Sequence, residues 1–266
     1  MTILVKIMTS INGACRPLFR VILFSIALGL TTSPALHALD KAALAAILDA
    51  HDRNIAHVLR DDSRKPAEVI EFSGINSGMR ALDVYAADGY YTYILARVVG
   101  ENGVVYAQNP PPGSNVEDIR QMYSLADSLD ERIEIANLRN VQHLREGFFD
   151  LSIAEASLDV VFLAQILHDF YNGDANYAAA LLAHLTSLLK PGGIIVVIDH
   201  AGDAEQDNAR LHRMQKAEAL KVAEQAGLTL IGDSDILTNS ADRHRRSVFD
   251  PMLGRNSDRF LLKFQK

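Results

Sequence analysis

The feature of the sequence that most constrains the fold is an alternation of short apolar runs with amphipathic helical patterns. The apolar runs, which are typical of buried strands, cover residues 80–85, 103–109, 158–165 and 194–199. Helical patterns separate them, and one of these, "YYTYILARVVG", stops at Gly100. Strands that alternate with helices predict an α/β three-layer sandwich around a mostly parallel sheet.

The two ends of the chain depart from this alternation. A broad apolar stripe predicts one continuous helix over residues 40–60, and a shorter helix follows over 66–75. Residues 209–227 have the pattern of one long helix that stops at a glycine. The last two apolar runs, 228–237 and 259–264, follow without a helix between them. We therefore expect the last strand to enter the sheet antiparallel to its neighbours.

The first 38 residues have the parts of a secretory signal peptide in their usual order. Lys6, Arg16 and Arg20 give a basic start without any acidic residue, "VILFSIALGL" follows, and small residues lead to Ala38. The apolar run is about half the length of the ~20 residues that span a bilayer, which favours a cleaved signal over an uncleaved anchor. We expect a periplasmic or secreted protein with no membrane anchor after cleavage.

The charge balance limits the kinds of partner that the chain can bind. There are 26 lysines and arginines against 33 aspartates and glutamates, which gives a formal net charge of −7. Proteins that bind nucleic acid present a basic face. We therefore expect a small-molecule ligand and no nucleic acid, while the sequence leaves the oligomeric state open.

Polar residues follow several of the expected strands at their carboxyl ends. Asp83 ends the first strand and Gly89 opens the next helix, Asn109 ends the second strand, and His168 and Asp169 come after the fourth. Ligands of open α/β sheets bind at the carboxyl ends of the strands, where the strand order reverses. The sequence therefore predicts a ligand site at this edge of the sheet.

Four segments, taken in this order, resemble the class I S-adenosylmethionine-dependent methyltransferases: "LDVYAADGYYT", "GVVYAQNP", "SLDVVFLAQILHDF" and "LLKPGGIIVVID". The resemblance covers roughly residues 65–266. With "HDF" and the closing "DRFLLKFQK", the chain also resembles a little-characterised family of predicted exported bacterial methyltransferases. The resemblance implies a Rossmann-like fold with a seven-stranded sheet and S-adenosyl-L-methionine as cofactor.

This interpretation divides the chain into three parts. Residues 1–38 are the signal peptide, residues 39–78 are an N-terminal helical segment packed on the core, and residues 79–266 are the methyltransferase-like domain. The expected ligand site belongs to the last of these parts.

The resemblance assigns the cofactor site to eight residues: Asp83, Tyr85, Ala87, Asp88, Gly89, Asn109, Asp150 and Gln165. Asp83 matches the acid that orients the amino acid end of the cofactor, and Gly89 matches a glycine of the first loop. Asp88 either contributes there or caps the following helix. Asp150, with Glu146 behind it, is the candidate for the adenine contact, and Gln165 stands beside the methionine part.

Three of these positions depart from the family's pattern. Tyr85 and Ala87 stand where glycines are expected, and Asn109 replaces the acid that binds both ribose hydroxyls. The ring of Tyr85 either blocks the ordinary cofactor position or lies along one wall and stacks. Asn109 either keeps a weaker ribose contact through its amide or is a turn residue before proline.

His168 and Asp169 are the candidate catalytic residues. The pKa of a histidine, about 6.5, suits a general base toward a methyl acceptor, although a histidine here is also common in a pocket wall. His200, after the fifth strand, is a weaker candidate. We expect no metal, because no third ligand is spaced to join these histidines. The arginine-rich loop 241–258 either binds an anion or is a solvated surface loop.

Two functions follow from these observations. The leading one is methyl transfer from S-adenosyl-L-methionine to an unknown, small-molecule acceptor. The alternative is a catalytically silent protein of the bacterial envelope that keeps the methyltransferase fold and binds another ligand or partner. The altered first loop and the predicted export favour the alternative, and cofactor binding separates the two.

Overall fold

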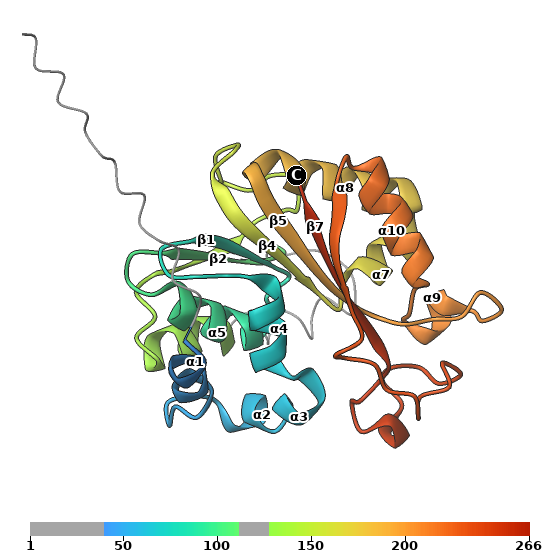
Figure 1. The fold of residues 1–266 in the computed structure, drawn as a ribbon, viewed down its shortest axis with the longest axis horizontal. Coiled ribbons are helices and arrows are strands. Elements are labelled where there is room, and N and C mark those ends of the chain that lie inside the picture. Colours follow the sequence, from blue (N-terminus) through green and yellow to red (C-terminus); the bar gives the residue numbers. More distant parts are fainter. Residues whose placement is uncertain (1–39, 112–127) are drawn as a thin grey trace, which may run out of the picture. The chain divides into compact units, whose positions relative to one another are not determined.

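The computed structural model describes residues 40–111 and 128–266, which contain a seven-stranded sheet of order β3-β2-β1-β4-β5-β7-β6 (Figure 1). The strands are β1 (Arg80–Val84), β2 (Val104–Asn109), β3 (Val141–Arg145), β4 (Leu158–Ala164), β5 (Leu189–His200), β6 (Thr229–Ser234) and β7 (Arg259–Gln265). β1 to β5 pair in parallel, and β7 is antiparallel to both β5 and β6. These pairings confirm the predicted mostly parallel sheet with an antiparallel last strand.

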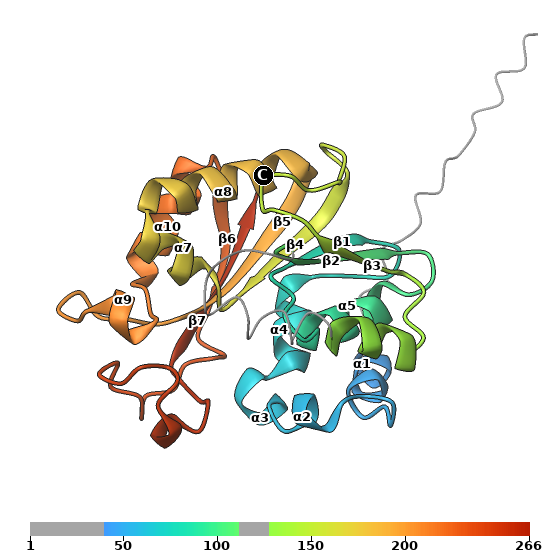
Figure 2. The same ribbon diagram turned by 180° about the vertical axis from the view of Figure 1, so that it is seen from behind.

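Helices cover both faces of the sheet (Figure 2). One face carries α1 (Lys41–Leu48), α4 (Pro66–Ser73) and α5 (Tyr90–Val99), and the other carries α7 (Leu167–Gly173), α8 (Ala175–Leu188) and α10 (Lys216–Gln225). In β4, Val160 and Phe162 belong to the core beside α5, whereas Val161 and Leu163 belong to the core beside α8. The two-residue period of a strand divides the apolar side chains between two buried layers.

The segment before α4 is not the single helix predicted for residues 40–60. After α1 the chain turns, and two one-turn helices follow, α2 (Ile55–Val58) and α3 (Asp61–Arg64). Arg53, which is 6 % exposed, holds the turn because its guanidinium donates to Asp61 Oδ1 at 2.7 Å. A buried guanidinium needs a charged partner, and this requirement overrides the helical pattern.

The long helix predicted for residues 209–227 is also divided. α9 (Asn208–Leu211) ends at His212, whose φ of 53° is left-handed, and α10 begins after a short extended segment. The break turns the side chain of His212 away from the direction that a continuing helix would give it. The prediction of one helix is therefore wrong at His212.

The side chain of Arg213 accounts for this break. It is 0 % exposed, and its guanidinium donates to Ala201 O at 2.9 Å, to Arg246 O at 3.1 Å and to Asp242 Oδ2 at 2.8 Å. These acceptors come from the end of β5 and from the loop 241–258. The chain leaves the helical path because the buried cation is satisfied only beside them.

Residues 1–38, with the predicted signal peptide, lie outside the described residues, so the signal peptide and the expected export stay predictions. Over 40–111 and 128–266, no helix is long and apolar enough to cross a membrane. Leu44 of α1 and Ile70 of α4 lie in the same core as α5.

Replacing Arg213 by methionine is expected to lower the free energy of unfolding by about 3–5 kcal/mol, because the Asp242 carboxylate stays buried without its partner. The matched control is Arg210→Met in α9, where the side chain is 72 % exposed and the change should stay within about 0.5 kcal/mol. Urea unfolding followed by circular dichroism measures both variants. Equal unfolding midpoints for the two variants would show that the buried pair does not stabilise the fold.

Candidate functional site

The ends of β1 and β4 meet at the point where the strand order reverses, and α3 lies against them. Arg64, the last residue of α3, donates to Gln165 Oε1 at 3.0 Å, directly after β4. Arg259, at the start of β7, donates to the carbonyl oxygen of Ser63 in the same helix. The carboxyl ends of β1, β2, β4 and β5, called here the carboxyl edge, are therefore covered in part by the α2–α3 segment.

The loop after β1 has the backbone of a glycine-rich turn without most of its glycines. The φ angles of Tyr85, Ala87 and Gly89 are 59°, 49° and 84°. A left-handed conformation costs a residue with a Cβ atom about 1–2 kcal/mol. Strain of this kind persists only where the surroundings enforce it, and it concentrates at functional sites.

The end of β2 enforces this loop conformation. Gln108 accepts from Tyr85 N–H with its side chain at 3.0 Å and from Ala86 N–H with its carbonyl at 2.8 Å. Asn109 accepts from Ala87 N–H at 2.8 Å and donates back to Ala87 O at 3.2 Å. The side chain of Asn109 thus fastens the first loop, and its ribose contact stays a prediction.

Asp83 lies at the centre of the carboxyl edge. Its side chain is 2 % exposed and accepts a hydrogen bond from Thr92 Oγ1 at 2.7 Å. Burial raises the pKa of Asp83 to about 7, although the Thr92 hydroxyl and the charge of Arg64 act in the opposite direction. A cation that enters the site would favour the ionised form of this carboxyl group.

The side chain of Tyr85 lies along the wall of this region. Its half-buried ring is nearly parallel to the ring of Phe148, with 6.3 Å between centroids and 19° between planes. Phe148 in turn meets Phe170 edge to face at 4.8 Å. This packing favours the wall interpretation of Tyr85, because the ring has apolar neighbours beside the loop.

Asp88 lies among basic side chains rather than simply capping α5. His57, Arg60 and Arg132 approach its Oδ2 at 3.1, 3.1 and 2.9 Å. Although burial alone raises its pKa, these partners hold the pKa of Asp88 well below its ordinary value. The described contacts give Asp88 the role of joining the α2–α3 segment to the helix at residues 128–135.

The candidates for adenine binding lie in the loop after β3. Asp150 is exposed, whereas Glu146 accepts from Ser152 N–H at 2.6 Å and so shapes the loop. Neither carboxylate is joined to the first loop by a side-chain bond in the described contacts, and the adenine contact of Asp150 stays a prediction. Phe148, between them, is the residue of this loop that reaches Tyr85.

His168 lies in a row of carboxylates and imidazoles at the ends of β4 and β5. Its Nδ1 is 2.7 Å from Asp199 Oδ1, and its Nε2 is 3.1 Å from Asp169 Oδ1. Nδ1 of His212 is 3.1 Å from the same Asp169 oxygen. Burial lowers the pKa of His168, but the charges of Asp199 and Asp169 outweigh it and raise the pKa to about 10. The catalytic roles of His168 and Asp169 stay predictions.

The expectation of no metal, which rested on His168 and His200, stays a prediction, because the structure groups His168 with Asp169 and His212 rather than with His200. His200 faces Ser257 instead, with Nδ1 2.7 Å from Oγ, and burial together with the charge of His168 lowers the pKa of His200. The side chain that joins His168 and Asp169 is that of His212. It comes from the break after α9, which the helical pattern did not predict.

Three residues at the carboxyl edge were not identified as site residues from the sequence. Asp199 ends the fifth strand, so its position at the edge follows from the same rule that selected Asp83. Arg64 and His212 lie in segments with helical patterns, and the sequence carries no indication that these helices end beside the sheet. Both were placed by buried arginines, Arg53 and Arg213, that break the helices.

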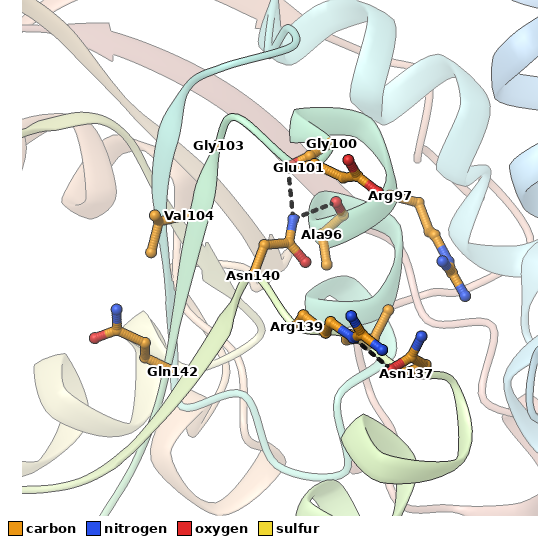
Figure 3. Close-up of a pocket in the computed structure, with 11 residues that line it drawn as sticks. Ala96, Arg97, Gly100, Glu101, Gly103, Val104, Asn137, Arg139, Asn140 and Gln142 are labelled. Carbon is orange, nitrogen blue, oxygen red and sulfur yellow. Dashed lines mark hydrogen bonds between the residues drawn. The ribbon is translucent and has the colours of Figure 1, made fainter.

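A separate cavity of about 690 Å³ lies at the other end of the sheet, where the turn before β2 and the segment before β3 line it (Figure 3). In it, Asn140 donates to Ala96 O at 2.8 Å and to Gly100 O at 2.9 Å. These segments precede their strands, so the cavity lies at amino ends. Ligands of such sheets bind at the carboxyl ends, and this cavity is therefore not the candidate cofactor site.

The strand order with its reversal between β1 and β4, the left-handed first loop and the acid at the end of β1 define the class I methyltransferase fold. Residues 75–244 match the model of a family described as a methyltransferase domain. The match covers more than half of the chain, and the protein belongs to this family within the class I S-adenosylmethionine-dependent superfamily. The cofactor of the family is S-adenosyl-L-methionine.

One curated relative is the ubiquinone/menaquinone biosynthesis C-methyltransferase UbiE of Teredinibacter turnerae. It is 26% identical over 166 residues, which are 62% of this chain and 59% of the relative, so the chain spans less than two thirds of that protein.

Two solved structures show the same fold. A SAM dependent methyltransferase from Aquifex aeolicus aligns with a TM-score of 0.58 at 18% identity, over 85% of this chain and 98% of that one. The [4+2]-cyclase SpnF aligns with a TM-score of 0.57 at 18% identity, over 77% of this chain and 80% of that one. At these identities the likeness shows the fold and leaves the reaction open.

Asp83 is expected to make the stability of the protein fall as the pH rises from about 4 to about 7. The native carboxyl, with its pKa raised to about 7, keeps its proton in this range, whereas the unfolded chain loses it near about 3.9. The contribution of Asp83 to the free energy of unfolding is largest below the pKa of the unfolded chain. Above the native pKa this contribution is lower, by on the order of 4 kcal/mol. Asp83→Asn should remove this fall.

Urea unfolding at about pH 5 and about pH 8 measures the effect as the difference between the two free energies of unfolding. Asp49→Asn, at an exposed position after α1, is the matched control and should leave the difference unchanged. The same pH dependence in Asp83→Asn and in the unaltered protein would contradict the prediction.

Proposed function

We propose that this protein transfers a methyl group from S-adenosyl-L-methionine to a small-molecule acceptor at the carboxyl edge. The observation that supports this most is the left-handed backbone of Tyr85 and Ala87, which the end of β2 enforces beside the buried Asp83. In a protein that did not bind a cofactor at this loop, the strained backbone of Tyr85 and Ala87 would serve no purpose. The net charge of −7 supports a small acceptor over nucleic acid.

The residues of the edge fit the amino acid end of the cofactor. That end carries an ammonium and a carboxylate, and the edge offers one carboxyl group and one guanidinium, those of Asp83 and Arg64. The guanidinium of Arg64 lies 4.4 Å from the Tyr90 ring centroid and donates to Gln165, which fixes its position beside the strand ends. Arg64 replaces no predicted residue and adds a carboxylate-binding group to the predicted set.

The residues beside the first loop fit the adenine end. Tyr85 and Phe148 present nearly parallel rings, a surface on which a flat base stacks. Ala87 has only a methyl side chain at the turn, and Gly89 has none. We place the adenine against the Tyr85–Phe148 wall, with Asp150 as its expected polar neighbour and Asn109 on the side of the ribose.

The bound cofactor supplies an electrophilic methyl group on a sulfonium. The contribution of this chain is to orient the reactants, which accounts for much of the rate enhancement in such a transfer. Gln165, whose φ of 63° is held by a bond from its N–H to Ile198 O at 2.7 Å, positions the wall between cofactor and acceptor. His168 and Asp169 follow it directly, so we place the acceptor beside them.

The silent alternative has one structural observation in its favour. The amide of Asn109 is occupied by Ala87 and by His143 at 3.1 Å, whereas methyltransferases of this class present a carboxylate to the ribose. Export to the bacterial envelope, which stays a proposal, would also separate the protein from abundant cofactor. Under this alternative the carboxyl edge binds another ligand.

Calorimetric titration with S-adenosyl-L-methionine and S-adenosylhomocysteine is expected to give one binding site per chain. Arg64→Met should weaken both affinities at least about tenfold, which corresponds to about 1.4 kcal/mol. The matched control is Arg139→Met, an exposed arginine at the cavity of Figure 3, which should leave them unchanged. No heat with either ligand at about 1 mM would support the silent alternative instead.

Substitution of Tyr85 separates stacking from obstruction. Under the stacking proposal, Tyr85→Phe keeps the affinity for S-adenosylhomocysteine within about twofold, and Tyr85→Gly weakens it about tenfold, because one base–aromatic contact is worth about 1–3 kcal/mol. The same titration measures both variants. Tighter binding by Tyr85→Gly would show that the ring obstructs the cofactor.

A further inference from the structure

Three potential metal ligands meet beside the carboxyl edge, two in the first turn of α7 and one directly after α9. They are His168, Asp169 and His212, and one ligand atom from each lies within 4.8 Å of the other two. Asp169 Oδ1 is 3.1 Å from both His168 Nε2 and His212 Nδ1. Two histidines with one carboxylate form a common donor set for divalent transition metals.

These distances match the spacing of ligands around one ion. Ligand atoms about 2.1 Å from a metal are about 3.0 Å apart at a right angle and about 3.4 Å apart at the tetrahedral angle. The two separations from Asp169 Oδ1 fall in this interval. The ligand nitrogens of the two imidazoles lie within 4.8 Å of each other, and His212 belongs to a turn with a partly exposed side chain.

Asp199 prepares His168 for this role. Its carboxylate is 0 % exposed and accepts from His168 N–H at 2.8 Å and from His200 N–H at 2.7 Å, which fixes its position. It also accepts from Nδ1 of His168 at 2.7 Å, so Nε2, which faces Asp169, is the nitrogen that would exchange its proton for a metal ion. Histidine ligands of metals nearly always donate their second nitrogen to such a carboxylate.

The outer side of the cluster is open. The side chains of Asp169 and His212 are 46 % and 37 % exposed, while His168 is buried. Three protein ligands with an open side are typical of catalytic metal sites, whereas structural sites have four. The ring of Phe249, with its centroid 4.7 Å from that of His212, provides an apolar border.

We propose that His168 Nε2, Asp169 Oδ1 and His212 Nδ1 bind one divalent transition-metal ion, with open positions that take an oxygen or sulfur of a small molecule. Metal binding itself is independent of the methyltransferase proposal. We take this small molecule to be the methyl acceptor, and that assignment rests on the methyltransferase proposal, which places the acceptor beside His168.

Calorimetric titration of the EDTA-treated, dialysed protein with Zn²⁺ and with Mn²⁺ tests the site. One equivalent of at least one ion should bind and raise the thermal midpoint. His212→Gln should weaken the binding at least about tenfold, and Asp199→Asn, which alters only the positioning residue, about 10- to 100-fold. His51→Gln, at an exposed position after α1, is the matched control and should bind like the unaltered protein.

The thermal midpoint in EDTA is the control for correct folding. His212→Gln should leave this midpoint unchanged and should abolish the rise of the midpoint that metal causes in the unaltered protein. No stoichiometric binding of either ion, or equal binding by His212→Gln and the unaltered protein, would overturn the proposal and leave the cluster as a hydrogen-bonded row. Titration with S-adenosylhomocysteine in EDTA keeps the two proposals apart, because a lost metal site does not remove cofactor binding.

Discussion

The parallel pairing of β1, β4 and β5 is the constraint on which the candidate site depends. These strands are apolar on both faces, so helices bury them completely, and a shift of register by one residue would turn every side chain to the wrong core. The fixed register brings the polar ends of the strands to one edge. Asp83, Gln165 and Asp199 share this edge although the chain separates them widely.

Two buried arginines determine which segments cover the carboxyl edge. Arg53 and Arg213 lie in segments whose composition favours continuous helices, yet the carboxylate that pairs with each guanidinium, Asp61 or Asp242, lies outside the predicted helix. The cost of an unpaired buried charge exceeds the modest helix propensity of a few residues. The resulting breaks place Arg64 and His212 beside the strand ends, where one offers a carboxylate-binding group and the other a metal ligand.

The first loop shows how the fold maintains a cofactor turn after its glycines are replaced. Tyr85 and Ala87 take left-handed conformations because Gln108 and Asn109 hold their backbone N–H groups. The same bonds use the amide of Asn109, whose position in the sequence indicated ribose binding. One residue thus supports the geometry of the site while its direct role toward a ligand stays a prediction.

The sequence by itself determined the class of fold, the strand ends that form the edge, the likeness to methyltransferases, and Asp83, Tyr85 and His168 as candidates, because strand periodicity and turn residues are local properties. Only the tertiary structure decided that Asp88 joins two helical segments and that Asn109 fastens the loop. It also decided that His212 completes a cluster with His168 and Asp169. These outcomes depend on which distant groups satisfy a buried charge or amide, and no local pattern encodes that pairing.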